Sequence, residues 1–242
     1  MHTPSILVSA LALALAQAAA AAPSSVLHRR QANANCTNVQ VFVARGSLEE
    51  IPGRQSKLVE AVCGTMPAGT TCGSTDIQYP ATFDAYCKSV GSGVSFALRA
   101  VEAYAAACPD SKMVLTGYSQ GAHLMGDVLS GAGGLIPNQN CTQATTAPLA
   151  AAAAKKVMAV TLFGDVRHTA NQTYNLGEGA GKSGILPRKG AQLTGLNVHS
   201  DKIHSWCNGQ DPVCSSGNDL DQHLTYFDQF TPDAAAFIKS KL

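Results

Sequence analysis

The chain has 242 residues, and its 17 lysine and arginine residues nearly balance 16 aspartate and glutamate residues, for a net charge of +1. No basic stripe or patch runs along it, which excludes a nucleic-acid-binding protein as the expected class. After the N-terminal leader no apolar run reaches the roughly 20 residues that a membrane helix needs, so we expect a soluble mature protein that is not associated with a membrane.

The N-terminus predicts export. Ile6 to Ala22 is an apolar, alanine-rich run that is too short to span a bilayer and is followed by small residues. We interpret residues 1–22 as a signal peptide and residues 23–30, which end in the dibasic pair Arg29-Arg30, as a pro-segment. The mature domain is then expected to occupy residues 31–242, to be secreted and to act as a monomer.

The cysteines support the same compartment. There are eight, and no pair has the C-x-x-C spacing of a zinc or redox motif, so complete disulfide pairing is expected rather than a metal site. Three N-x-[ST] sequons predict glycosylation at Asn35, Asn140 and Asn171.

Short β-branched runs alternate with longer helical patterns after residue 38. Strands are expected over Val39–Ala44, Asp76–Tyr79, Lys112–Thr116, Val157–Phe163 and Lys202–Trp206. Helices are expected over Gln55–Val62, Val90–Ala107 and Ala122–Leu129, and from Pro232 onward. Because parallel strands need crossover connections of helix length, this alternation predicts an α/β fold, a three-layer α/β/α sandwich around a mainly parallel sheet.

Gly117-Tyr118-Ser119-Gln120-Gly121 matches the G-x-S-x-G nucleophile elbow. The motif lies between an expected strand and an expected helix, which is the setting that the elbow requires. A side chain at position 117 or 121 would crowd the neighbouring elements in so sharp a turn, which explains both glycines. We therefore predict Ser119 as the nucleophile of a serine hydrolase.

A serine hydroxyl needs a general base and a carboxylate that orients this base. The order Ser, acid, His of α/β-hydrolases points to Asp211 and His223, and Asp211 lies inside the ring that a disulfide between Cys207 and Cys214 would close. The competing candidates are the acids Asp165, Asp201, Asp219 and Asp221 and the bases His123, His168, His199 and His204. His123 and His204 lie inside an expected helix and strand, His168 comes too early, and His199 would need another acid such as Asp165.

A tetrahedral intermediate needs donors for its oxyanion. The elbow supplies the backbone N–H of the residue after the nucleophile, Gln120. The segment after the first strand contains Ser47, which can offer both its N–H and its hydroxyl, although a serine at that place is also a common cap of a turn or helix.

Four elements together resemble the fungal cutinase and acetylxylan esterase family: Ala44-Arg45-Gly46-Ser47, the elbow, Asp211-Pro212-Val213-Cys214 and His223. The resemblance covers nearly the whole mature chain. It implies a compact, lidless α/β-hydrolase whose triad falls on Ser119, Asp211 and His223 and whose oxyanion hole falls on Ser47 and Gln120, with no metal or organic cofactor. It also implies the pairs Cys36–Cys108 and Cys207–Cys214. The resemblance does not place Cys63, Cys72, Cys87 and Cys141, and we expect Cys63–Cys72 and Cys87–Cys141.

The resemblance leaves two substrates open, a plant polysaccharide bearing acetyl groups and the plant polyester cutin. The cysteine count, Tyr79-Pro80-Ala81 and the Asp-Pro acid loop are more like the acetylxylan esterases, whereas Arg45-Gly46-Ser47 is closer to the cutinases. We expect acetylxylan as the substrate, with cutin as the alternative. Without a large lid, activity on soluble short-chain esters should not require an interface.

Two rival interpretations belong to other classes. The first is a secreted wall-binding protein that keeps the fold without catalysis, which labelling by a fluorophosphonate would distinguish. The second is a nucleotide site at residues 177–183, Gly-Glu-Gly-Ala-Gly-Lys-Ser, although its spacing is one residue short of a P-loop. We interpret that segment as a flexible loop bordering the cleft.

Overall fold

The computed structural model of this chain describes residues 35–242. The expected signal peptide, residues 1–22, and pro-segment, residues 23–30, therefore lie outside the described residues, as do residues 31–34 of the expected domain. Within the described range, no helix is both long and apolar enough to cross a membrane.

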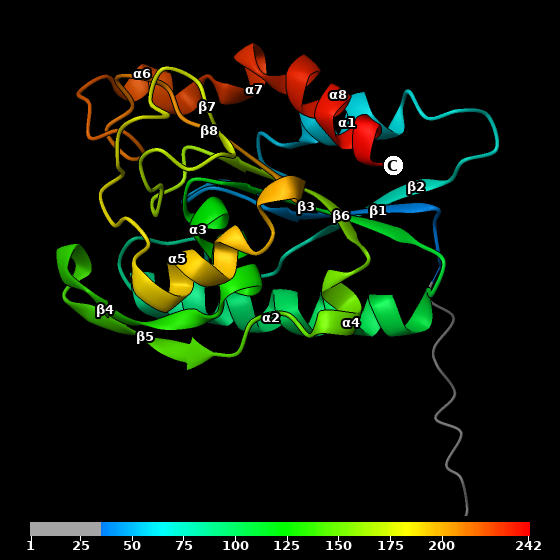
Figure 1. The fold of residues 1–242 in the computed structure, drawn as a ribbon, viewed down its shortest axis with the longest axis horizontal. Helices are drawn as coiled ribbons and strands as arrows, with labels where there is room; N and C mark the ends of the chain where they lie inside the picture. Colours follow the sequence, from blue (N-terminus) through cyan, green and yellow to red (C-terminus); the bar gives the residue numbers. More distant parts are fainter. Residues whose placement is uncertain (1–34) are drawn as a thin grey trace, which may run out of the picture. The chain divides into compact units, whose positions relative to one another are not determined.

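The centre of the fold is a six-stranded sheet with the order β2-β1-β3-β6-β8-β7 (Figure 1). Every neighbouring pair in it is parallel, which confirms the expected parallel sheet. Its strands are β1 (Val39–Ala44), β2 (Cys72–Asp76), β3 (Lys112–Tyr118), β6 (Val157–Phe163), β7 (Asn175–Leu176) and β8 (Ile203–Trp206).

Helices cover both faces of this sheet, as expected for a three-layer sandwich. In Figure 1, α1 and α8 lie on one face, and α2, α3, α4 and α5 lie on the other. The helices are α1 (Ser56–Cys63), α2 (Tyr86–Ala107), α3 (Gln120–Ser130), α4 (Ala151–Ala154), α5 (Gly190–Asn197), α6 (Leu220–Leu224), α7 (Tyr226–Gln229) and α8 (Thr231–Lys241), with short 3₁₀ turns at Pro137–Gln139 and Ser200–Lys202. An apolar core fills the space on each side of the sheet.

The second strand is misplaced in the sequence-based prediction. It pairs with β1 from Cys72 to Asp76, and the last bond between the two strands runs from Ile77 N–H to the Val43 carbonyl at 2.8 Å. Ile77 and Tyr79 are buried beyond the end of the strand, so their apolar character reflects core packing rather than sheet pairing. The expected strand Asp76–Tyr79 was therefore wrong in its bounds, because it shares only Asp76 with the observed β2, Cys72–Asp76.

A two-stranded antiparallel hairpin of β4 (Ala132–Ile136) and β5 (Cys141–Thr146) was not predicted. It packs against α2, which begins at Tyr86, four residues earlier than predicted, and a disulfide joins the two elements. Gly133 and Gly134 adopt φ values of 125° and 108°, which few other residues can adopt. Glycines at these positions remove the alternating pattern by which a strand is recognised.

The order of the strands places a topological switch point between β1 and β3. The chain passes from β1 to β2 on one side and then to β3 on the other, so the direction of winding reverses between β1 and β3. Ala44 and Gly117 are paired at the carboxyl ends of these two strands. Ligand sites in open α/β sheets lie at such a switch point, and the loops that follow the two strands meet there.

Four disulfides link the described cysteines, none of which is free. They join Cys36 to Cys108, Cys63 to Cys72, Cys87 to Cys141 and Cys207 to Cys214, with Cα separations of 5.3 to 6.0 Å. These are the pairs expected above. The last one closes the loop that follows β8, in which Asp211 lies.

Candidate active site

Ser119 occupies a sharp turn between β3 and α3. Its backbone has φ 55° and ψ −118°, a conformation that residues with a side chain rarely adopt. A Cβ on Gly117 would lie 2.4 Å from the Gly121 carbonyl oxygen, and one on Gly121 would lie 1.9 Å from that of Ala44. Both glycines are therefore required by close backbone approach, as their positions in the motif indicated.

Ser119, His223 and Asp211 form one continuous hydrogen-bonded chain. The hydroxyl Oγ of Ser119 lies 3.0 Å from His223 Nε2, and His223 Nδ1 lies 2.8 Å from Asp211 Oδ2. Their exposed fractions are 8%, 6% and 0%, so the carboxylate is sealed and only the serine end is near solvent. This geometry lets the imidazole accept the serine proton while the carboxylate fixes its tautomer.

Asp211 is held in its charged form. Its Oδ1 accepts N–H bonds from Val213 at 2.6 Å and Cys214 at 3.3 Å, and its Oδ2 accepts from His223 and from the Tyr226 hydroxyl. Burial by itself would raise the pKa of the Asp211 carboxyl, but the hydrogen bonds and charge of His223, together with the bonds from Tyr226 and Val213, lower it below its usual value. The carboxylate is therefore ionised wherever the enzyme is folded near neutral pH.

Two residues that sequence reasoning missed shape the space around His223. The Tyr118 hydroxyl donates to the His223 carbonyl at 2.8 Å, and the two rings lie 5.2 Å apart with a tilt of 32°. Gly164, which follows β6 at φ 55°, leaves room for the imidazole, because a Cβ there would come within 2.9 Å of His223 Nδ1. The only sequence signal was position, since Tyr118 lies inside the elbow and Gly164 follows the buried strand.

Ser47 lies in the loop after β1, beside the elbow. Gly46 packs against the Tyr118 ring so closely that a Cβ would lie 2.7 Å from it, and Leu48 N–H donates to the Ala81 carbonyl at 2.7 Å. Between these fixed neighbours, the Ser47 hydroxyl is buried and has no hydrogen-bond partner among the described residues. A buried donor without a partner is costly unless a ligand completes it, so this hydroxyl is available to an oxyanion.

Gln120 is the first residue of α3, where a backbone N–H has no acceptor within the helix. Its side chain is fully buried, accepting from the Ser89 hydroxyl at 2.9 Å and donating to the Thr82 carbonyl at 3.1 Å. These bonds to α2 and its preceding loop fix the start of α3, and with it the direction of the Gln120 N–H.

The competing histidines and acids are all accommodated elsewhere. Across the described range, none of their side chains hydrogen-bonds to the Ser119 hydroxyl, although the His123 backbone N–H donates to the Ser119 carbonyl at 3.1 Å in the first turn of α3. His204 stacks on Phe237 at 3.6 Å, and His168 lies 3.4 Å from the Ser205 hydroxyl, with burial lowering its pKa. Asp219 accepts the Asp221 N–H at the start of α6. His199 is half-buried and Asp201 is exposed.

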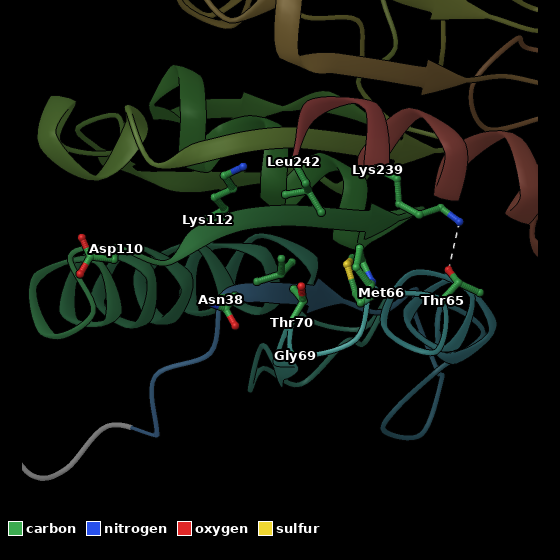
Figure 2. Close-up of a pocket in the computed structure, with 11 residues that line it drawn as sticks. Asn38, Thr65, Met66, Gly69, Thr70, Asp110, Lys112, Lys239 and Leu242 are labelled. Atoms are coloured by element: carbon green, nitrogen blue, oxygen red, sulfur yellow. Dashed lines mark hydrogen bonds between the residues drawn. The ribbon is translucent and has the colours of Figure 1, made fainter.

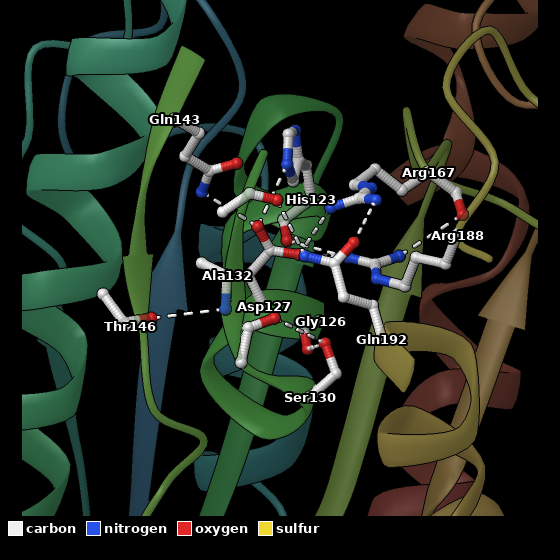
Figure 3. A network of polar contacts seen from close by, with 12 residues as sticks. His123, Gly126, Asp127, Ser130, Ala132, Gln143, Thr146, Arg167, Arg188 and Gln192 are labelled. Carbon is white, nitrogen blue, oxygen red and sulfur yellow. Dashed lines mark hydrogen bonds and ion pairs between the residues drawn. The ribbon is translucent and has the colours of Figure 1, made fainter. Parts of the chain in front are cut away.

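His123 and Asp165 belong instead to a buried ionic network centred on Asp127 of the elbow helix, α3. Figure 3 shows His123, Asp127, Arg167 and Arg188 of this network. Asp127 on α3 lies 3.1 Å from His123 Nε2 and 3.3 Å from Arg188, and Arg188 donates to Asp165 at 2.6 Å. The side chains of His123, Asp127, Asp165 and Arg188 are at most 2% exposed. The network connects α3 to the segment after β6, and in the described part of the chain none of its side chains hydrogen-bonds to the Ser119 hydroxyl.

The P-loop-like segment, residues 177–183, packs on the acid loop. Gly179 N–H donates to the Cys207 carbonyl at 2.9 Å, and Lys182 Nζ donates to the Gly209 carbonyl at 2.6 Å. The segment therefore borders the loop that carries Asp211. In the described part of the chain, no group of three or more histidine, cysteine, aspartate or glutamate side chains is arranged to hold a metal ion.

A pocket of about 520 Å³ lies at the opposite edge of the sheet (Figure 2). Asn38 and Lys112 at the starts of β1 and β3 line it, together with Lys239 and Leu242 at the end of the chain. None of the residues that line it belongs to the hydrogen-bonded chain of Ser119. The hydrogen-bonded chain of Ser119 lies away from this pocket, at the carboxyl edge of the sheet that carries the elbow.

Comparison with known proteins agrees with this geometry. The Cutinase family model matches residues 35–242. Among curated relatives, the acetylxylan esterase of Hypocrea jecorina is 34% identical over 86% of this chain and 68% of its own. Acetylxylan esterase 2 of Talaromyces purpureogenus is 32% identical over 86% of this chain and 88% of its own. Cutinase 11 of Verticillium dahliae is 30% identical over 100% of this chain and 78% of its own. The chain belongs to the cutinase family.

Solved structures of the cutinase family share the fold. The catalytic core of the Trichoderma reesei acetyl xylan esterase superposes with a TM-score of 0.75 at 32% identity, covering 86% of this chain and 100% of that one. A Trichoderma reesei cutinase gives 0.58 at 25% identity, covering 86% and 78%. Membership of this family makes the protein a serine carboxylic ester hydrolase with a compact α/β-hydrolase fold.

Proposed function

We propose that this chain is a secreted esterase that removes acetyl groups from an acetylated plant-wall polysaccharide, with Ser119, His223 and Asp211 as its catalytic triad. The unbroken chain of hydrogen bonds from Ser119 Oγ through His223 to the buried Asp211 carries the proposal. Such a chain activates a serine without a metal or an organic cofactor.

The mechanism uses each group at a stated atom. Ser119 Oγ attacks the ester carbonyl carbon while His223 Nε2 takes the hydroxyl proton, and the oxyanion is stabilised by the Gln120 N–H and by Ser47. Collapse of the intermediate breaks the bond to the alcohol oxygen, which receives the proton from His223. Water then attacks the acetyl-enzyme with His223 again as base, and acetate leaves.

The acetyl preference is supported by the relatives. The two acetylxylan esterases at 34% and 32% identity and the structural neighbours at TM-scores near 0.75 bear that name, whereas the neighbouring Trichoderma reesei cutinase gives a TM-score of 0.58. The acid loop, Asp211 to Cys214, has the form that the sequence resemblance associated with the acetylxylan esterases.

A specific feature favours cutin hydrolysis as the second candidate. Leu48 is 73% exposed directly after Ser47, and Leu224 is 37% exposed directly after His223. Leu220, one helical turn before Leu224 on α6, is 58% exposed. Aliphatic side chains next to the proposed oxyanion and base residues suit a long acyl chain better than a sugar.

The test is a rate comparison of the purified enzyme on acetylated xylan, on cutin and on p-nitrophenyl esters of increasing acyl length, with Ser119→Ala as the control. Acetate release from xylan with rates that fall beyond short chains supports the proposal. Release of hydroxy fatty acids from cutin, with rates maintained on long acyl chains, supports the second candidate. Activity of Ser119→Ala close to that of the wild type would refute the triad.

Secretion and glycosylation complete the proposal. Asn35, Asn140 and Asn171 are all exposed, so glycosyltransferases could reach each sequon on the folded surface. The expected leader and the four disulfides support passage through an oxidising compartment. A mobility shift of the enzyme secreted by a fungal host after endoglycosidase treatment, removed by replacing all three asparagines, would test the glycans.

A further inference from the structure

Tyr226 lies at the buried end of the proposed triad. Its side chain is completely buried on α7, three residues after His223, and its hydroxyl lies 2.6 Å from Asp211 Oδ2. This is the same carboxylate oxygen that accepts from His223 Nδ1. Asp211 Oδ2 therefore accepts hydrogen bonds from both the His223 imidazole and the Tyr226 phenol.

The direction of the Tyr226 bond follows from its surroundings. Asn208 N–H donates to the phenol oxygen at 2.9 Å, and the nearby Cys214 sulfur, 3.2 Å away, is in a disulfide and has no proton to give. The single hydroxyl proton is therefore directed to Asp211, which can only accept. Burial first, and then the Asp211 charge, raise the pKa of Tyr226 far above its ordinary value, so the phenol keeps this proton.

We propose that Tyr226 is a positioning residue of the esterase, whose hydroxyl fixes the rotation of the Asp211 carboxylate and shares the charge that this carboxylate presents to His223. The inference rests on the proposed function of the triad. Val213 and Cys214 N–H groups hold Oδ1, so Tyr226 is the group other than His223 that holds Oδ2. Without it, the oxygen that orients the imidazole is fixed by the imidazole alone.

The charged and titratable groups around this pair are few. His223 faces it from α6, with its ring 6.2 Å from that of Tyr226 at an angle of 90°, and Tyr118 faces it from β3 at 6.3 Å. The guanidinium carbon of Arg54 lies 6.0 Å from the centre of the Tyr118 ring, and Arg54 is ion-paired with Glu49. An Asp211 carboxylate that loses the phenol bond presents more of its charge to His223.

Tyr226→Phe removes the hydroxyl and keeps the ring. We expect kcat on p-nitrophenyl acetate to fall about tenfold or more, with little change in KM, because the Asp211 carboxylate can then rotate and orients the His223 imidazole less well. The acid limb of the kcat/KM profile should move to higher pH. A purely structural hydroxyl would move neither quantity.

Tyr174→Phe is the matched control. Tyr174 is also buried, and its hydroxyl donates to the Asn197 side chain at 3.0 Å. Neither residue belongs to the triad. Tyr174→Phe should lower the melting temperature, by less than Tyr226→Phe because its acceptor is a neutral amide, and leave kcat and the pH profile unchanged. A Tyr226→Phe enzyme with the kcat and pH profile of the control would overturn the inference while leaving the triad intact. Failure of the triad assignment would show separately, because a Ser119→Ala enzyme would then remain active.

Discussion

Replacing Arg188 by methionine tests whether the buried ionic network holds the elbow helix. Arg188 is 1% exposed and donates to Asp165 at 2.6 Å, to Asp127 at 3.3 Å and to the His123 carbonyl at 2.9 Å. Methionine fills a similar volume but leaves both carboxylates without their shared partner. Asp127 then keeps His123 at 3.1 Å and the Arg167 guanidinium at 3.4 Å.

The expected loss is large. Removing one partner of a buried ion pair costs about 3–5 kcal/mol, because the remaining charge stays desolvated. For a domain of this size each kcal/mol shifts the melting temperature by about 2–4 °C, so Arg188→Met should melt roughly 6–20 °C lower. Adding Asp165→Asn to Arg188→Met removes one of the stranded charges and should restore part of the loss.

The loss should also depend on pH. Burial by itself would raise the pKa of Asp127, but His123, Arg188 and Arg167 hold it well below its ordinary value. A group with a depressed pKa in the folded state contributes stability above its unfolded pKa of about 3.9, and this contribution is lost as the pH falls toward the folded value. The difference between wild type and Arg188→Met should therefore be largest near neutral pH and narrow below about pH 4.

Urea unfolding with the disulfides intact, at pH 7 and at about pH 3, measures these differences, and Lys189→Met is the control. Lys189 is the adjacent residue and is exposed, so its replacement should change stability by no more than about 0.5 kcal/mol. Equal stability of Arg188→Met and Lys189→Met at pH 7, or a difference that grows on acidification, would refute the reasoning.

Three further predictions concern the elbow and its partners. Asp211→Asn should keep the fold and lower kcat by about three to four orders of magnitude through loss of the correct imidazole tautomer. Asp201 is exposed, and Asp201→Asn should leave kcat unchanged. The reverse result would identify a different acid. Ser47→Ala should lower kcat on p-nitrophenyl acetate roughly 10²–10³-fold, and Ser47→Thr should retain more of it, unless the hydroxyl does not meet the oxyanion. Gly121→Ala should abolish activity and lower the melting temperature, because its Cβ would lie 1.9 Å from the Ala44 carbonyl oxygen. Gly91→Ala, with open space around it in α2, should be neutral or stabilising. A stable, active Gly121→Ala enzyme would show that the turn can relax.

Much of this molecule is readable from local pattern. The nearly continuous apolar run of Val157–Phe163 predicted β6 with its observed bounds, because a strand buried on both faces has no polar side to confuse the pattern. The elbow was readable because its glycines and serine are adjacent in sequence. The hairpin β4–β5 and the bounds of β2 were missed, because glycines and cysteines in them serve turns and disulfides and carry no alternation.

The sequence by itself determined the parallel α/β order, the elbow at Ser119 and a short list of acids and bases in which Asp211 and His223 stood first. Only the tertiary structure decided what surrounds them. It put the Tyr226 hydroxyl on Asp211, Gly164 against the imidazole and Arg188 between two buried carboxylates. Such contacts join different elements, and that between Arg188 and Asp127 spans 61 residues of the chain. They depend on how packed elements fill space, and no local spacing encodes that.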